Sequence, residues 1–334
     1  MASRITASWV VTVLSTAAAC SGSEAASGLF DGGAESADGG GTSPSGGSSS
    51  SGGGSSSGGT AAGSSSGSSS GATHSSSSGG ASSSSGGGGS SGSVGTSDGG
   101  VCGVKLTTGV PPSKNFDLST WELTLPTGAT LDPTIIGPSQ LTGGYTSQYF
   151  FTGPDGSMDF WAPVTGVTTM NSKYPRSELR EMKGGSEYNW SLTAGTATLS
   201  ASVAVTQLPP PSGKVVVGQI HANGTSDLPL LELAYKGTGV ISAEILPTFS
   251  STTQTDTQLA SGVALGECFT YTIQTDSSAL LQISVNGQTG YKQTVDASWE
   301  AATFYFKAGD YVQENTGAST DGAAVSFYSL SVSH

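Results

Sequence analysis

The segment Leu281-Gln-Ile-Ser-Val285, followed directly by Asn286-Gly287, carries the clearest structural signal in this chain of 334 residues. Apolar and polar residues alternate along it, which is the period of a strand with one buried face. Asn-Gly is a preferred pair for the two-residue turn of a β-hairpin, because both turn positions need a positive φ. The segment therefore predicts a strand that leads into an antiparallel hairpin.

The same alternation recurs on both sides of this hairpin. It is present in residues 121–125, 197–203, 215–221, 269–273 and 324–330. No long segment has helical periodicity, and Gly- and Pro-rich turns separate the alternating runs. Many short strands joined by such turns are typical of β-sandwiches. We therefore predict that residues 101–334 form one all-β domain, an antiparallel β-sandwich of the jelly-roll kind.

The amino-acid composition of the residues before 101 differs from that of the predicted domain. Hydrophobic residues make up 34% of the chain, whereas ordinary globular domains have about 45–50% with Gly counted. Residues 21–100 are dominated by Ser and Gly, and such a segment cannot bury enough apolar surface to fold. We expect a disordered linker there. The glycines lack a three-residue period, which excludes collagen, and no apolar run after residue 20 approaches the ~18 residues of a membrane span.

Residues 1–20 have the features of an export signal: a basic Arg4, an apolar stretch and small residues near a cleavage point. The signal ends in Ala17-Ala-Ala-Cys20, which is similar to the site at which bacterial lipoproteins are cut and acylated. Lipidation of Cys20 would hold the protein on the bacterial outer membrane or cell surface. The alternative is ordinary signal cleavage, with secretion and an unmodified thiol. Apart from this anchor we expect no membrane partner.

The other two cysteines are Cys102 and Cys268. An even pair in an exported protein predicts a disulfide, here between the start of the domain and a later strand. The alternative is two buried thiols. No further Cys or His stands at ligand spacing, and no acidic cluster has the spacing of a calcium loop. We therefore expect no metal and no other cofactor, and we expect a monomer.

The formal net charge is −13, which excludes nonspecific nucleic-acid binding as a function. The few cations are placed unevenly: within residues 101–334, Arg occurs only at Arg176 and Arg180. His221 is the only histidine that we expect inside the folded domain, since His74 lies in the linker and His334 is the last residue.

Three predicted strands place polar side chains on one face. The first presents Arg176, Glu178 and Arg180, the second Gln219 and His221, and the third Tyr305, Lys307, Gly309, Tyr311 and Gln313. Such faces suit a concave sheet that lines a cleft for an anionic ligand. Each segment taken alone also allows a structural role: a solvated ladder of ion pairs, a satisfied structural histidine, or a tyrosine that packs in the sandwich.

Together, the three segments resemble a known family. RSELRE (176–181), QIH (219–221) and YFKAG-x-Y-x-Q (305–313), in this order, resemble the signature regions of polysaccharide lyase family 7, the alginate lyases, and WELTLP (121–126) resembles an early strand of that family. The resemblance covers residues 101–334. The family's third region usually reads YNQ, and Val312 replaces the Asn. We expect Val312 to point away from the face of Tyr311, and Asp310 to add negative charge near the site.

The resemblance implies cleavage of alginate, an anionic polysaccharide, by β-elimination at the 4-O-glycosidic bond, with a 4,5-unsaturated uronate in the product and no cofactor. The role it implies for Arg176 and Gln219 is to neutralise the substrate carboxylate, and His221 and Tyr311 would move protons. Ile220 within QIH favours guluronate-containing blocks. The remaining matched residues would bind or orient: Arg180 and Lys307 for neighbouring carboxylates, Glu178 for the two arginines, and Gln313 along the cleft.

Three other functions compete with this interpretation. A noncatalytic carbohydrate-binding module would need aromatic platforms but has no use for an aligned His and Tyr beside Arg and Gln. A glycoside hydrolase needs two carboxyl groups across a bond, and two neighbouring arginines would hold Glu178 ionised, the wrong state for the acid. A lyase for another polyuronate, such as glucuronan, is not separated from an alginate lyase by the sequence.

Overall fold

The computed structural model describes residues 101–223 and 227–334. The predicted export signal, linker and acylation site at Cys20 lie outside the described residues. Within the described residues, no helix combines the length and apolar character that a membrane crossing requires.

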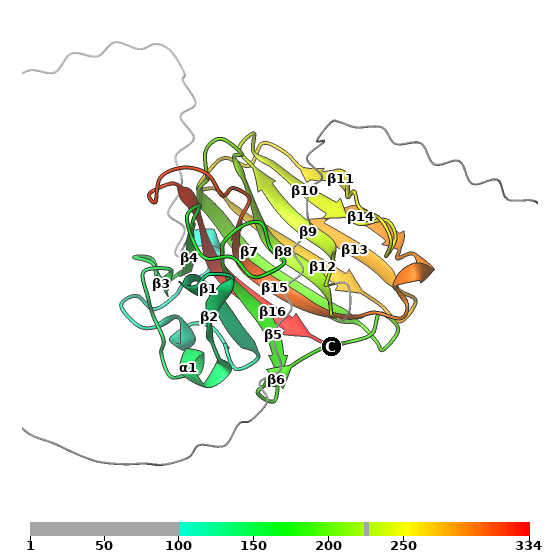
Figure 1. Ribbon diagram of the computed structural model, residues 1–334, viewed down its shortest axis with the longest axis horizontal. Coiled ribbons are helices and arrows are strands. Elements are labelled where there is room, and N and C mark those ends of the chain that lie inside the picture. Colours follow the sequence, from blue (N-terminus) through cyan, green and yellow to red (C-terminus); the bar gives the residue numbers. More distant parts are fainter. Residues whose placement is uncertain (1–100, 224–226) are drawn as a thin grey trace, which may run out of the picture. The chain divides into compact units, whose positions relative to one another are not determined.

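Two antiparallel sheets make up the described chain (Figure 1). The first, sheet A, has nine strands in the order β11-β10-β9-β8-β15-β5-β1-β2, with β6 paired to β5; the second, sheet B, has seven in the order β14-β13-β12-β7-β16-β4-β3. The strands of sheet A are β1 (Trp121–Ala129), β2 (Asp132–Ile136), β5 (Arg176–Lys183), β6 (Ser186–Glu187), β8 (Lys214–Asn223), β9 (Pro229–Lys236), β10 (Val240–Ile245), β11 (Thr255–Ala260) and β15 (Thr303–Val312). Those of sheet B are β3 (Phe150–Thr152), β4 (Met158–Pro163), β7 (Ala197–Gln207), β12 (Cys268–Thr275), β13 (Leu280–Val285), β14 (Gln288–Thr294) and β16 (Gly322–Ser333).

The helices of the described chain are short. They are α1 (Pro138–Thr142) and three 3-10 turns, Val101–Gly103, Pro112–Lys114 and Ala297–Trp299. This confirms the predicted all-β class, and each of the six alternating segments lies within a strand. The predicted hairpin is also present: Val285 pairs with Gln288, and Asn286 and Gly287 have φ values of 50° and 75°.

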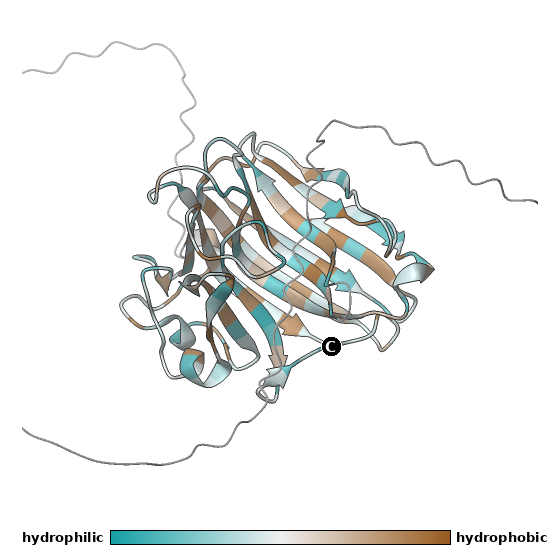
Figure 2. Cartoon of the chain, in the orientation of Figure 1, coloured by the Kyte–Doolittle hydropathy of each residue, from teal (hydrophilic) through white to brown (hydrophobic). Residues whose placement is uncertain are grey.

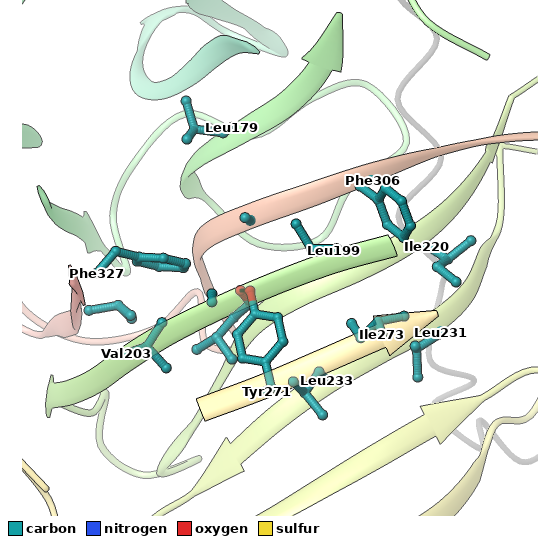
Figure 3. Packing of buried hydrophobic residues seen from close by; sticks show 14 of the residues in the cluster. Leu179, Leu199, Val203, Ile220, Leu231, Leu233, Tyr271, Ile273, Phe306 and Phe327 are labelled. Atoms are coloured by element: carbon teal, nitrogen blue, oxygen red, sulfur yellow. Dashed lines mark hydrogen bonds between the residues drawn. The ribbon is translucent and has the colours of Figure 1, made fainter. Parts of the chain in front are cut away.

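Alternation along the strands builds the core between the sheets. Brown and teal residues alternate along many strands in Figure 2. Leu179, Ile220 and Phe306 of sheet A meet Ile273 and Phe327 of sheet B, and all five are buried (Figure 3). Truncation of a buried Phe to Ala costs about 3–5 kcal/mol, so this layer is the main source of stability. It also fixes the opposite face of sheet A, because every residue between two core positions must point outward.

A disulfide joins Cys102 to Cys268, with 5.5 Å between the two Cα atoms. It links the start of the described chain to the first residue of β12. The predicted pairing is therefore confirmed, and the alternative of two buried thiols is wrong.

Candidate active site

The face of sheet A that points away from sheet B, called the polar face below, collects the predicted site residues. Strands β5, β15 and β8 are neighbours in the sheet, although up to about 130 residues separate them in the sequence. In their register, Tyr311 pairs with Arg176, Lys307 lies between Arg180 and Gln219, and Tyr305 pairs with His221. Directly paired side chains on one face have Cβ atoms about 4.5–5.5 Å apart. The sheet thus brings all three sequence motifs into one patch.

Glu178 is the centre of a buried hydrogen-bond network on this face. Its carboxylate accepts a 2.9 Å bond from Nη1 of Arg176 and a 2.6 Å bond from Nε2 of Gln219. Lys307 Nζ lies 3.4 Å from the same carboxylate. A carboxylate that is only 1% exposed would be costly without such partners. Glu178 therefore holds one guanidinium, one amide and one ammonium group in fixed positions.

The 2.9 Å bond from Arg176 agrees with the expectation that Glu178 orients the arginines, and for Arg180 this stays a prediction. Arg180 Nη2 forms a 3.0 Å ion pair with Glu187 of β6. Its guanidinium carbon lies 4.0 Å from the centre of the Tyr305 ring, a cation–π contact. Glu178 itself turns toward β8, and the short strand β6 supplies the carboxylate beside Arg180.

Tyr311 lies under the Arg176 side chain. The guanidinium carbon of Arg176 is 4.0 Å from the centre of the phenol ring, and the Tyr174 ring packs on Tyr311 with 6.2 Å between centroids. The Tyr311 hydroxyl lies 3.4 Å from Oγ of Ser172. The phenol is therefore held between a cation and the segment that precedes β5.

The hydrogen bonds of His221 assign its tautomer. Nδ1 lies 2.9 Å from the Ala222 carbonyl oxygen and 3.1 Å from the Tyr305 hydroxyl. A carbonyl oxygen can only accept, so Nδ1 carries the proton in the neutral ring. The lone pair is then on Nε2, which is the atom that can take a proton from a ligand.

Strand alternation places Asp310 on the core face of β15, and a β-bulge lies beside it at Gly309. The register between β15 and β8 shifts between Ala308 and Tyr311, and Gly309 has a φ of 149°. A Cβ atom at Gly309 would lie 2.7 Å from the Ser177 carbonyl oxygen, so only glycine fits. Asp310 points into the core, where its Oδ2 accepts a 3.0 Å bond from the Ala162 amide of sheet B.

The expectation that Asp310 adds charge beside the site is therefore wrong. Its side chain is fully buried, and burial raises the pKa of this carboxyl well above its usual range, with a further contribution from the charge of Glu178. Val312 lies in the core, away from the face of Tyr311, as predicted.

A row of polar residues crosses sheet A at the level of Gln219. Successive register partners connect Glu122, Arg180, Lys307, Gln219, Glu232, Glu244 and Asp256. The row is cationic at Arg180 and Lys307, with Glu122 beyond them on β1, and it is acidic on the β9 to β11 side of Gln219. Two lysines, Lys214 and Lys236, form ion pairs with Glu244 and reduce the acidic charge there. Sequence reasoning missed the acidic half, because the order of the strands is not visible in the sequence.

Other contacts also escaped the sequence analysis. Tyr305 was placed on the polar face, but its contacts with His221 and Arg180 were not predicted, because they depend on the order of the strands. Ser172 and Tyr174 lie outside the strands and carry no periodic signal. His334 also belongs to the folded part: its Nε2 contacts Glu181, and its ring lies 4.7 Å from that of Tyr188.

The central site residues are almost inaccessible: Arg176 and Tyr311 are 2% exposed, and Gln219 and His221 are 0% exposed. A ligand that reaches them must therefore displace the groups that cover them. Gln313 is half-buried at the margin, where its Nε2 lies 3.5 Å from the Tyr311 carbonyl oxygen.

The polar side chains of the patch offer several kinds of acid–base and electrostatic chemistry. Within residues 101–223 and 227–334, no group of three or more His, Cys, Asp or Glu side chains could hold a metal ion. The patch does combine fixed cationic and amide donors, a neutral imidazole and a phenol. This set can neutralise a carboxylate, remove a proton beside it and protonate a leaving oxygen.

Comparison with known proteins identifies similar chains. The sequence model of a family described as alginate lyase matches residues 116–334. A curated alginate lyase from Klebsiella pneumoniae is 31% identical over 279 residues, which cover 67% of this chain and 91% of that protein.

Solved structures agree with the sequence comparison. The crystal structure of an alginate lyase from Pseudomonas aeruginosa is 37% identical, covers 65% of this chain and 99% of its own, and has a TM-score of 0.62. Alginate lyase A1-II′, described as a member of polysaccharide lyase family 7, is 40% identical, with a TM-score of 0.61 and coverages of 67% and 98%. One of its variants, with a His-to-Asn and a Tyr-to-Phe substitution, was crystallised with a substrate written GGMG.

Proposed function

The chain belongs to polysaccharide lyase family 7, the alginate lyases, and from that premise we propose that it depolymerises alginate by β-elimination at the 4-O-glycosidic bond. The observation that supports this most strongly is the network that joins Arg176, Glu178 and Gln219 beside Tyr311 and His221. A noncatalytic binding module would not require this set, and a hydrolase would require a second carboxyl group across the bond.

The reaction begins at C5 of a uronate, whose proton is weakly acidic because it lies next to the carboxylate. Removal of that proton produces an enolate-like dianion, and preorganised donors stabilise such charge. We assign this role to Arg176 and Gln219, which Glu178 orients through 2.9 Å and 2.6 Å hydrogen bonds. Glu178 is thus a positioning residue, and it keeps the two donors aligned before the substrate arrives.

Two groups exchange protons with the sugar. His221 can accept the C5 proton at Nε2, because Nδ1 carries the ring proton. Tyr311 can donate its proton to O4 of the leaving sugar as the bond to C4 breaks. In guluronate, H5 and O4 lie on opposite sides of the ring, so two groups are needed. In mannuronate they lie on the same side, and Tyr311 could serve in both steps.

Residues next to this catalytic group are placed to bind the adjacent sugars of the polymer. Lys307 and Arg180 lie on the cationic side of Gln219 and would hold the carboxylates of adjacent uronates, while Gln313 lies at the margin. We also propose a preference for guluronate-containing blocks. Ile220 is buried in the core (Figure 3), so any influence on the substrate would act through the positions of Gln219 and His221. The substrate and product written GGMG and GGG in the A1-II′ complexes are consistent with this preference.

We further propose that the protein is exported and either secreted or held at the cell surface through a lipid on Cys20. The disulfide supports an oxidising compartment. It also accounts for two of the three cysteines, so Cys20 has no partner within one chain.

A substrate panel tests the proposed function. The full-length protein is mixed with polyguluronate, polymannuronate and glucuronan, and the ultraviolet absorbance of unsaturated uronate is followed. The proposal predicts product from alginate blocks, faster from polyguluronate. Product from glucuronan alone would move the assignment to another polyuronate lyase, and no product from any of the three would contradict lyase activity.

A further inference from the structure

We propose that Ser172 is a positioning residue for the reaction, through a hydroxyl group that joins Arg176 to Tyr311. The proposal rests on the proposed function, since it concerns two residues to which that function gives catalytic roles. Ser172 lies outside the three polar strands, in the segment between β4 and β5, and it is buried, with 9% of its surface exposed.

Four distances define the contacts of the Ser172 hydroxyl. Oγ accepts a 2.9 Å hydrogen bond from Nη2 of Arg176 and lies 3.4 Å from the Tyr311 hydroxyl. It donates a 2.9 Å bond to the Tyr174 carbonyl oxygen and lies 3.3 Å from the Tyr174 amide. One hydroxyl therefore contacts the group that would neutralise the substrate carboxylate and the group that would protonate O4.

The directions of these bonds follow from counting protons. A serine hydroxyl has one proton to donate, and the Tyr174 carbonyl, which can only accept, takes it. Toward Arg176 and Tyr311, Ser172 can therefore only accept. Its oxygen has two lone pairs: Arg176 takes one, and the longer contacts from the Tyr174 amide and from Tyr311 share the other, so in the 3.4 Å contact Tyr311 donates the proton of its own hydroxyl. The protonated phenol is the form that an acid needs, and so long a contact is readily exchanged for a glycosidic oxygen.

Ser172 also completes the anchoring of Arg176. Nη1 of the guanidinium is bound to Glu178 and Nη2 to Ser172, so the fork is fixed at both ends above the Tyr311 ring. Without the serine hydroxyl, the hydrogen bond to Glu178 remains, but the orientation of the guanidinium fork is less restricted. Arg176 would keep its charge and its position beside Glu178, but its guanidinium group would no longer be held in one orientation. This loss affects the transition state more than substrate binding.

The contact between Ser172 and Tyr311 also predicts different effects on the cleavage of guluronate and mannuronate. On guluronate, Tyr311 acts only as the acid and His221 is the base. A contact in which Ser172 accepts favours the protonated phenol that this role requires. When Tyr311 must first act as base, it needs to be a phenolate, and Ser172 can donate to one only by giving up its bond to the Tyr174 carbonyl. Loss of the hydroxyl should therefore slow guluronate cleavage more than mannuronate cleavage.

The test compares Ser172→Ala with Ser172→Thr, which keeps a hydroxyl, and with Ser202→Ala, which alters a buried serine of sheet B. Initial rates are measured on polyguluronate and polymannuronate, with thermal unfolding of each protein. We expect Ser172→Ala to lower kcat on polyguluronate about tenfold or more, as expected for loss of a hydrogen bond to a charged group, with KM nearly unchanged. Ser172→Thr should recover most of the rate, and Ser202→Ala should keep the wild-type rate.

Two results would overturn the proposal for Ser172 while wild type remains active: an unchanged kcat in Ser172→Ala, or equal losses in the Ala and Thr variants. A loss that is equal on both polymers would overturn the block dependence. If the wild-type protein makes no unsaturated product from either polymer, the proposed function itself is wrong, and the role of Ser172 in the reaction falls with it.

Discussion

Replacement of Arg176 by Ala should remove most of the lyase activity and part of the stability. The side chain is 2% exposed, and its contacts include the Glu178 carboxylate at 2.9 Å, Ser172 Oγ at 2.9 Å and the Tyr311 ring at 4.0 Å. The substitution deletes these contacts, and with them the guanidinium charge above the Tyr311 ring. It leaves Gln219 and Lys307 as partners of Glu178.

The two effects have different magnitudes. Loss of one preorganised donor to a developing oxyanion costs about 2.7–4 kcal/mol, or roughly 10²–10³ in kcat. Breaking a buried ion pair costs about 3–5 kcal/mol of stability when the remaining charge has no other partner. Glu178 retains an amide and an ammonium group, so we expect a stability loss at or below the lower end of that range. The domain should remain folded at 25 °C.

The assay is the initial rate of unsaturated-uronate formation from alginate, with thermal unfolding measured on the same samples. Arg176→Lys is the matched variant: it keeps the charge but cannot form the fork between Glu178 and Ser172, so it should recover only part of the rate. Near wild-type turnover in folded Arg176→Ala would show that the network is structural only, and would refute the role of charge neutralisation.

Three further outcomes follow from other parts of the structure. Burial raises the pKa of the Asp310 carboxyl in the folded state, so the protonated side chain contributes to stability at low pH and this contribution is lost as pH rises. The melting temperature of Asp310→Asn minus that of wild type should therefore increase with pH. A constant difference would contradict the assignment. His221→Asn should slow polyguluronate cleavage more than polymannuronate cleavage, as measured by initial rates; equal losses would contradict the division of roles with Tyr311. A chain that begins at Val101 should fold and keep its turnover on soluble alginate, because the predicted linker has too little apolar sequence to join a core; an insoluble or inactive truncation beside active full-length protein would contradict this.

The faces of the strands could be predicted from the sequence, because side chains alternate with a period of two. That rule placed Arg176 and Glu178 on one face and Val312 on the other, and the core confirms both. The disulfide and the all-β class were also within reach, since cysteine count and turn residues are local signals.

Contacts across strands were not predictable in the same way. Glu178 and Gln219 are 41 residues apart, and only the order of β5, β15 and β8 brings them within 2.6 Å. The hydrogen bond that buries Asp310 against the Ala162 amide depends on how sheet B packs on sheet A, which the spacing of charges does not show. Ser172 lies in a connecting segment, where no periodic rule applies. The missed features thus depend on sheet order, sheet packing and loops, which are tertiary properties.

The most direct test of the account measures two products in one reaction. Wild-type protein and Tyr311→Phe, which deletes one hydroxyl and keeps the ring, are incubated with alginate, and new reducing ends and unsaturated uronates are counted together. β-Elimination predicts one unsaturated uronate for each new reducing end in the wild type, and almost no product from folded Tyr311→Phe. Reducing ends without unsaturated uronates would show hydrolysis, and full activity of Tyr311→Phe would contradict the proposed proton donor.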